Sequence, residues 1–362
     1  MNNYYLLSEL YRTLQTLLPL ARVGLLINLS LMVLSLAQSH NCRLATLVTV
    51  WPLAGKRDSL IQRARRWLAN RHLSQEIYYR PIISETISNW DGSEFALSMD
   101  RTDIENLRSI LTVGVCFQKR IIPLAWMVLP FGATSAEAQI ALLEAIRPLL
   151  PDGKKVRITL FADCEFRAVE LQKYCRRNHW HWQVGVKSDT YYRTENGKWQ
   201  KLSTLKPKKG QRLYRQNIYL TKKHDFGLVN LIVEWRASED HPRYIVLDQK
   251  ADRHAWRRGR KRFWIEPTFR DWKSYGFDLE NTSLNHSRRI SNMILAMSIS
   301  YLWMLYLGNH LTVTGQRSKL EAKHKRDYSL FRLGRDWLRR CFALGRRIPI
   351  GFTVTHQEKS TP

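Results

Sequence analysis

Acidic residues and cysteines are both scarce in this chain. The 362 residues include 31 Asp and Glu against 58 Lys and Arg, which gives a formal net charge of +27. This imbalance is far larger than solubility requires, and it attracts polyanions over a wide surface. Nucleic acid is therefore the first class of partner that the composition indicates, and an anionic membrane surface is the second.

The few cysteines exclude a disulfide framework. There are five of them, an odd number, and the sequence contains no Cys-x-x-Cys motif. Such usage predicts reduced thiols in a cytoplasm. Two cysteines and two histidines lie fairly close together, at Cys164, Cys175, His179 and His181. Their spacing fits no standard zinc pattern, so a zinc site is not expected.

Long hydrophobic runs are also missing. The most apolar run, residues 23–37, is about fifteen residues long and is interrupted by Asn28, Ser30 and Ser35. A membrane span needs about twenty apolar residues. No basic segment precedes an apolar stretch at the N-terminus, so no signal peptide is expected. We therefore expect a buried helix here and no membrane partner.

Changes in hydrophobic periodicity divide the chain into five predicted regions. These are a helical N-terminal region proposed to bind DNA (1–85), the first part of an α/β domain (90–187), a β-rich insertion (188–250), the last part of the α/β domain (251–310), and a basic C-terminal helical region with a tail (311–362). The tail is expected to be disordered from Gly351 onward.

Within the α/β domain, the pattern predicts three strands, then helix, strand, helix and strand. The predicted strands cover 95–100, 110–118, 121–129, 156–163 and 180–187, and the helices cover 135–150 and 166–177. This order indicates a mixed α/β sheet. Later elements are predicted as strands at 211–220, 227–235 and 243–247, and as helices at 289–307 and 328–344.

An amphipathic helix is predicted over residues 56–68. Its apolar stripe consists of Leu60, Ala64, Trp67 and Leu68. Arg63 and Arg66 point away from this stripe, and two interpretations are open for them. They contact DNA, which the charge of the whole chain favours, or they belong to an ordinary solvated helix face.

Three acidic residues stand at positions where catalytic groups gather. Asp100 and Asp163 end two predicted strands, and Glu266 follows the insertion. Strand ends of an α/β sheet collect ligands and catalytic groups, and three carboxylates suit hard ions such as Mg²⁺ or Mn²⁺. Two such ions about 4 Å apart stabilise the attacking and leaving oxygens of a phosphodiester displacement. Taken singly, each residue is as well explained as a turn aspartate or a surface glutamate.

Glu266 is surrounded by cations in the stretch from Arg262 to Lys273. Pro267 is acceptable only in a first helical turn, so a helix should begin near Trp264 or Ile265. Glu266 and Lys273 then fall on one face, about 10 Å apart along the axis. The residues expected to pack inward from the adjacent face are Ile265, Phe269, Trp272 and Gly276, with Gly276 also a candidate C-cap. An ordinary basic amphipathic helix is the alternative.

Over roughly residues 50–310, the chain resembles the DDE-type transposases of bacterial insertion sequences. In one group of these enzymes the last acid lies in a signature of Tyr, two residues, Arg, three residues, Glu, six residues and Lys. Arg262, Glu266 and Lys273 match it, but Gly259 stands at the Tyr position. The segments that begin at Asp100 and Asp163 are similar to the family's Asp-Arg-Thr and Asp-Arg-Gly-Phe segments. In the second segment Cys164 and Glu165 replace the usual pair.

The resemblance implies an RNase H-like catalytic fold, a mixed sheet with flanking helices and a β insertion before the last acid. It also implies that Asp100, Asp163 and Glu266 are catalytic residues that bind two Mg²⁺ or Mn²⁺ ions. The expected reaction is cleavage at the ends of the element, followed by attack of the freed 3′-hydroxyl on target DNA. Double-stranded DNA is the implied partner, the active species is a homodimer that brings two ends together, and the protein is cytoplasmic and associated with the bacterial nucleoid.

The resemblance also assigns DNA contacts in the signature stretch. Arg262 would hold phosphate as a bidentate fork and Lys273 as a point charge. Gly259 cannot replace the tyrosine, so either Arg258 or Arg260 compensates or activity is reduced. Arg270, in the same basic stretch, is expected to contact DNA as well.

Related enzymes cut through a DNA hairpin and flip a base onto an aromatic ring. A flipped base needs an exposed flat ring to stack on, and the candidates are Phe263 and Trp235, unless these are core residues. Two other functions remain open: a nuclease of the same fold that does not transpose, and a catalytically decayed transposase copy that only binds DNA, with Gly259 as a sign of the decay.

Overall fold

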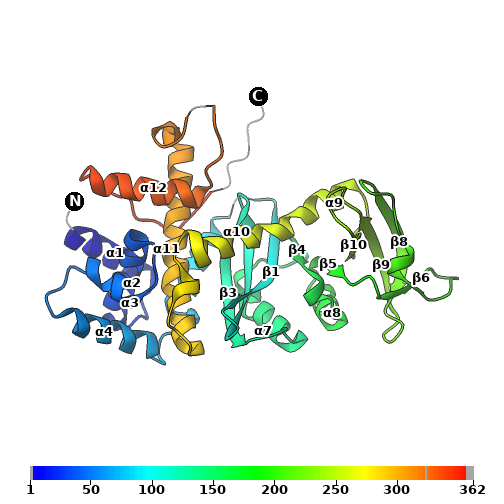
Figure 1. Ribbon diagram of the computed structural model, residues 1–362, viewed down its shortest axis with the longest axis horizontal. Coiled ribbons are helices and arrows are strands. Elements are labelled where there is room, and N and C mark those ends of the chain that lie inside the picture. Colours follow the sequence, from blue (N-terminus) through cyan, green and yellow to red (C-terminus); the bar gives the residue numbers. More distant parts are fainter. Residues whose placement is uncertain (1–2, 91, 323, 356–362) are drawn as a thin grey trace.

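The computed structural model describes residues 3–90, 92–322 and 324–355. A ten-stranded sheet runs through the right half of the molecule, and helices surround the long helix α11 in the left half (Figure 1). The longer helices are α1 (Asn3–Leu17), α2 (Val23–Ser39), α4 (Arg57–Ala69), α6 (Arg80–Ser88), α7 (Ala136–Ile146), α8 (Val169–Arg177), α9 (Arg253–Gly259), α10 (Ile265–Arg270), α11 (Ser287–Val313) and α12 (Leu330–Ala343). Short turns of helix, α3 (Leu44–Leu47) and α5 (Gln75–Tyr78), connect the N-terminal ones.

The first half of the sheet has the strand order β3-β2-β1-β4-β5. Its strands are β1 (Glu94–Ile104), β2 (Arg108–Phe117), β3 (Arg120–Pro130), β4 (Arg157–Ala162) and β5 (His181–Val186). β1, β2 and β3 form an antiparallel meander, whereas β4 lies parallel to both β1 and β5. This is the mixed, RNase H-like sheet that the sequence predicts, and the predicted fold class is confirmed.

The insertion extends the same sheet instead of forming a separate one. β10 (Arg243–Leu247) pairs antiparallel with β5, and the order continues through β9 (Phe226–Glu234), β8 (Arg212–Leu220), β6 (Tyr191–Arg193) and β7 (Gln200–Lys201). The sequence predicts β8, β9 and β10 but misses β6 and β7, since these two strands are too short to show an alternating pattern.

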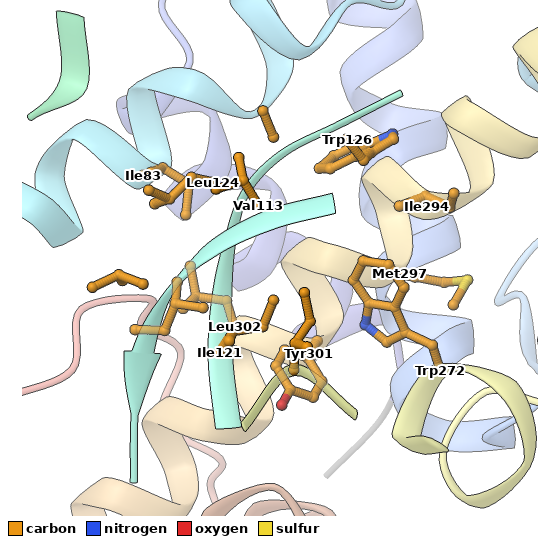
Figure 2. Packing of buried hydrophobic residues seen from close by; sticks show 14 of the residues in the cluster. Ile83, Val113, Ile121, Leu124, Trp126, Trp272, Ile294, Met297, Tyr301 and Leu302 are labelled. Carbon is orange, nitrogen blue, oxygen red and sulfur yellow. The ribbon is translucent and has the colours of Figure 1, made fainter. Parts of the chain in front are cut away.

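The core of the helical half is α11. Nearly all of its side chains are buried, and in Figure 2 Ile294, Met297, Tyr301 and Leu302 lie against strand residues such as Trp126. By length and composition α11 could cross a membrane, and α2 with the bent segment at residues 44–50 passes the same test as a pair. However, 89% of the most apolar window of α11 is buried inside the protein, as in a soluble core helix.

Helix α12 lies unusually close to α11 because both helices carry a glycine at the crossing. A Cβ on Gly308 would lie 2.0 Å from the Leu330 carbonyl oxygen, and one on Gly334 would lie 1.9 Å from that of Met304. The chain then returns over the core, where Phe352 and Val354 are buried. The expectation of disorder from Gly351 is therefore wrong for residues 351–355, and residues 356–362 lie outside the described part.

Candidate active site

Two of the three predicted acids meet at neighbouring strands. Asp100 lies in β1 and Asp163 directly follows β4, and these strands run parallel with Met99 opposite Ala162. Each carboxylate is fixed by a backbone donor: Asp100 Oδ1 accepts from the Arg101 N–H at 2.7 Å, and Asp163 Oδ1 accepts from the Glu165 N–H at 2.7 Å. The parallel register places both side chains on one face of the sheet.

The third acid comes from a segment that crosses this face. α9 continues through a 3₁₀ turn, η5 (Arg260–Trp264), into α10, which lies across the strands in Figure 1. The Ser98 hydroxyl donates to the Arg262 carbonyl at 3.0 Å, and Lys261 Nζ pairs with Glu94 at 2.5 Å, so β1 holds the segment in place. α10 begins at Ile265, as the position of Pro267 predicts, and Glu266 is in its first turn.

The three acids and Arg262 share one electrostatic environment. The pKa of the Asp100 carboxyl is raised to about 7, chiefly by burial and also by the negative charges of Asp163 and Glu266, against the lowering effect of a backbone hydrogen bond and of Arg262. Burial lowers the pKa of the Arg262 guanidinium, which lies within electrostatic reach of all three acids. A site where carboxylates repel each other in this way attracts a cation.

The donor set fits a hard divalent ion in kind, since it offers only carboxylate oxygens. Within the described residues, however, no three His, Cys, Asp or Glu side chains are gathered closely enough to hold a metal ion. Asp100 and Asp163 are half-buried and fixed, whereas Glu266 is exposed on the helix surface. Glu266 is therefore the side chain that would move toward the other two when an ion binds.

Sequence reasoning treats Glu165 only as a departure from the family pattern, but the structure gives it a clear contact. Arg101 Nε donates to Glu165 at 3.0 Å, and Arg101 also pairs with Asp103 at 2.7 Å. Glu165 in turn accepts hydrogen bonds from the backbone and hydroxyl of Thr134. This network ties the last part of β1 to the turn after Asp163. The adjacency of Arg101 to Asp100 was the only signal for it. β1 continues to Ile104, so the prediction that this strand ends at Asp100 is wrong, because the pairing with β2 extends past the acid.

A pocket of about 490 Å³ opens beside Asp163, between the strand ends, the insertion and α9. Its lining includes Ala162 and Cys164, the two neighbours of Asp163, together with Phe263. Its positive charge comes from Lys206, Arg236, Arg243, Arg260 and Arg262. No motif or periodicity in the sequence singles out Arg236 and Arg243, because both reach the pocket from the insertion.

Phe263 is one of three aromatic residues in the lining of this pocket, with Tyr244 and Trp256. The guanidinium of Arg262 lies 4.3 Å from its ring centroid, and those of Arg236 and Arg243 each lie 5.4 Å away. Arg243 Nη1 is buried without a hydrogen-bond partner among the described residues. Trp235, the other predicted stacking ring, is not part of the pocket lining. Its indole N–H donates to the Glu239 carbonyl at 2.9 Å.

The remaining predicted DNA contacts are spread along the segment. Arg258 donates to Gln249 at 2.9 Å, and Arg260 lies 5.9 Å from the ring of Trp256. Arg270 is exposed and lines a second basic cavity between α10 and α12. Lys273 lies in a π-helical turn, η6 (Asp271–Tyr275), and pairs with Glu280 at 2.8 Å. Gly276 caps that turn, and Ile265, Phe269 and Trp272 are buried as expected.

Arg63 and Arg66 lie elsewhere, on α4 at the opposite side of α11 (Figure 1). Arg63 donates to the Asn28 side chain at 2.7 Å, and Arg66 is exposed. The structure therefore does not bring them to the acids. A contact between α4 and a long DNA duplex remains a separate prediction.

A mixed sheet of this order, with acids on adjacent strands under a cationic segment, defines an RNase H-like enzyme that acts on nucleic acid. Comparison with known families then identifies it further. The model of the transposase DDE domain matches residues 124–303, from β3 into α11. The chain is thus a DDE-type transposase, an enzyme of DNA transposition, and the resemblance seen in the sequence is confirmed. Transposases of this kind generally use divalent metal ions.

The matched range includes Asp163 and Glu266 but begins after Asp100. Among solved structures, the chain is similar to a cryo-EM structure of the piggyBac transposase synaptic complex with hairpin DNA, at 11% identity and a TM-score of 0.49. That similarity covers 92% of this chain and 77% of the other. No curated protein matches the chain.

Proposed function

We propose that this transposase cleaves the ends of its own insertion sequence and joins them to target DNA, with Asp100, Asp163 and Glu266 as its catalytic acids. The observation that supports the proposal best is the register of the parallel strands β1 and β4, which puts Asp100 beside Asp163; burial and the charges of Asp163 and Glu266 raise the pKa of Asp100 there. Residues from three distant parts of the chain converge electrostatically on one place, inside a protein of strongly positive charge.

The three carboxylates are proposed to hold Mg²⁺ or Mn²⁺, with two ions as the working number. When bound, such ions neutralise charge on the scissile phosphate and activate the attacking oxygen. The protein's own residues have other tasks. Asp100 and Asp163 stay fixed through their backbone hydrogen bonds, and Glu266 completes the set from α10. Rigid positioning of this kind supplies much of the catalysis in phosphoryl transfer.

The substrate is proposed to be double-stranded DNA, bound mainly through its phosphates. Arg262 is placed to hold the phosphate nearest the acids, because it is half-buried among them. Lys273 would exchange its pairing with Glu280 for a phosphate, and Arg258, Arg260 and Arg270 would extend the contact. The exposed face of α4 is proposed to bind DNA further from the site. A homodimer that holds two ends, in the cytoplasm at the nucleoid, completes the proposal.

The pocket beside Asp163 is proposed to receive a nucleotide that leaves the DNA stack. Phe263 offers it a ring, and three arginines around that ring offer charge for its phosphate. Since Trp235 lies outside the pocket, Phe263 is the better of the two candidates. Burying an unstacked base requires such a combination of an aromatic face and positive charge.

The test uses labelled duplexes that carry the inverted repeats flanking the gene, incubated with Mg²⁺. Asp100→Asn, Asp163→Asn and Glu266→Gln are each expected to abolish cleavage while binding to the repeat survives. Glu170→Gln, an exposed carboxylate on α8, is the matched control and should cleave normally. Full activity in any of the three acid variants would remove that residue from the site.

The products of the wild-type reaction separate the three functions left open by the sequence. Joined products with target DNA mean transposition, and cleavage without joining means a nuclease. Binding without metal-dependent cleavage means a decayed copy.

A further inference from the structure

The backbone conformation at residue 259 does not require a glycine. Its φ is −59°, a value that any residue adopts, so the reason for the missing side chain must be the space available to it. A Cβ at this position would lie 2.0 Å from Nε2 of Gln183, 2.7 Å from its Cδ and 3.0 Å from its Oε1. The amide of Gln183 therefore lies directly against the glycine, in the volume that any side chain at residue 259 would enter.

Gln183 belongs to the same face of the sheet as the acids. It stands opposite Phe161 in the parallel pair of β5 with β4, and Asp163 follows two residues later on that strand. Gly185, two residues after Gln183, leaves room for the backbone that follows Asp163, because a Cβ there would lie 2.9 Å from the Cys164 nitrogen. Gln183 and Gly259 both line the pocket that also contains Phe263.

The chemistry of Gln183 differs from that of the cationic side chains in the pocket. The lining already has five cationic side chains for a phosphate, whereas an amide carries one acceptor oxygen and two donor hydrogens. Such a group recognises a base edge that presents a donor beside an acceptor, as adenine does. Gln183 is only 6% exposed, so the residues packed around it limit the rotamers that its side chain can adopt.

We propose that Gln183 is a specificity-determining residue of this transposase, which reads the edge of the nucleotide base placed in the pocket, and that Gly259 makes room for it. In this chain the side chain of Gln183, on β5, occupies the space that a side chain at residue 259 would fill. The proposal rests on the proposed function, because it assumes that DNA enters the pocket beside Asp163.

The experiment varies the nucleotide next to the cleavage position among the four bases in the labelled repeat duplex. The cleavage rate of each duplex is compared for the wild type, Gln183→Leu and Gly259→Ala. The wild type is expected to prefer one base about tenfold or more, the range of a bidentate amide contact. Gln183→Leu, which keeps the size but loses both hydrogen bonds, should reduce the preference to within about twofold.

Gly259→Ala tests the geometry without altering Gln183 itself. Its Cβ displaces the amide, so it should weaken the same preference, and the double variant should be no worse than Gln183→Leu alone. Gln200→Leu, on exposed β7, is the matched control and should keep the wild-type preference. An unchanged preference in Gln183→Leu, or a wild type with none, would overturn the proposal.

Failure of this proposal is distinguishable from failure of the proposed function. If the wild type cleaves no duplex, entry of a base into the pocket is measured instead by the fluorescence of 2-aminopurine at the varied position, with Ca²⁺ present and no reaction needed. A fluorescence rise on binding that Gln183→Leu alters and Gln200→Leu does not supports base reading in a protein without cleavage activity. No rise with the wild type refutes it.

Discussion

The two halves of this molecule bury apolar side chains to different extents. Around α11, the helical half buries large apolar side chains such as Trp303 and Met304, both 0% exposed. In the insertion half, strand β8 has buried residues only at Ile218 and Leu220, and a separate small cluster forms around Ile232 and Leu247. There, cations lie on aromatic rings, as Arg212 does on Trp256 at 3.5 Å.

We infer from this difference that the α11 half contributes most of the stability and that the insertion offers cations to DNA. Apolar burial stabilises the α11 half whatever the salt concentration, since it does not depend on charge. The insertion keeps its cations at the surface by stacking them on rings, where a polyanion can reach them. The proposed acids lie between the two, at β1 and β4, and the pocket beside them lies where β5 meets β10. Four predictions test this division, from the largest expected effect to the smallest.

Trp303→Ala should lower the free energy of unfolding by about 3–5 kcal/mol, because it leaves a large cavity in the core of α11. It also frees the Pro349 carbonyl, to which the indole N–H donates at 2.9 Å. Urea unfolding measures the loss. The matched variant is Trp199→Ala in the insertion, where the ring is half-buried beside Arg193, and it should cost less than about 1 kcal/mol. Equal losses would contradict the division.

Asp100→Asn should change how stability depends on pH. The pKa of Asp100 in the folded state is raised to about 7 from the ordinary aspartate value of 3.8. Between these values the folded state binds the extra proton, so the wild type loses stability as pH rises from about 4 to about 7, by up to about 4 kcal/mol. The asparagine variant should lack this decline, measured by urea unfolding across the range.

Adding a divalent ion tests the same prediction in a second way. An ion held by the ionised carboxylate should flatten the decline in the wild type, and it should bind more tightly above pH 7 than below it. Calorimetric titration with Mg²⁺ at two pH values measures this. Equal affinity at both values would show that Asp100 is not a ligand.

Glu234→Gln should loosen the insertion without unfolding the helical half. Its carboxylate is 4% exposed and accepts from Arg212 at 3.2 Å, from Arg236 at 3.1 Å and from the Trp256 indole at 3.0 Å. Removing that charge should cost about 2 kcal/mol. Hydrogen exchange should rise in β8 and β9 and stay unchanged in α11. The control Asp225→Asn alters an exposed partner of Arg193 and should have no such effect.

Lys209→Ala should have the smallest effect on stability, within about 0.5 kcal/mol. Its ammonium lies 5.9 Å from the Trp235 ring, in an exposed basic loop. If the insertion uses such cations for phosphate, the salt dependence of duplex binding should lose a slope of about 0.9. Lys154→Ala, exposed in the turn before β4, serves as control. An identical slope for both variants and the wild type would argue against the contact.

Much of the fold could be predicted from the sequence because its strands are apolar runs bounded by turns. β10 was predicted with its exact bounds, and α10 was placed by Pro267 alone. The continuity of β5 with β10 could not be predicted, since strand pairing across an insertion leaves no local signal. The burial of Phe352 was missed for a similar reason: it depends on contacts with distant residues such as Thr86.

The candidate site divides in the same way. Asp163 and Glu266 could be proposed because a strand end and a motif spacing are visible in the sequence, whereas Asp100 lies inside β1 and not at its end. Arg243 and Gln183 could not, because they reach the pocket only through the pairing of β5 with β10. Gly259 was noticed as a departure, but its cause lies in the amide of a residue on another strand. Spacing along the sequence thus reveals motifs, but it does not reveal side chains that reach the site from other strands.

The hydrogen bond from Ser98 to the Arg262 carbonyl joins residues 164 positions apart, and this has a consequence for protein synthesis. A ribosome makes both strand-end acids, then the whole insertion, before it reaches Glu266. A prematurely ended chain that stops within the insertion therefore lacks the third acid and the segment that carries it. The proposed cutting site can exist only in a protomer whose translation has passed α10, so unfinished products of the gene would leave the host chromosome uncut.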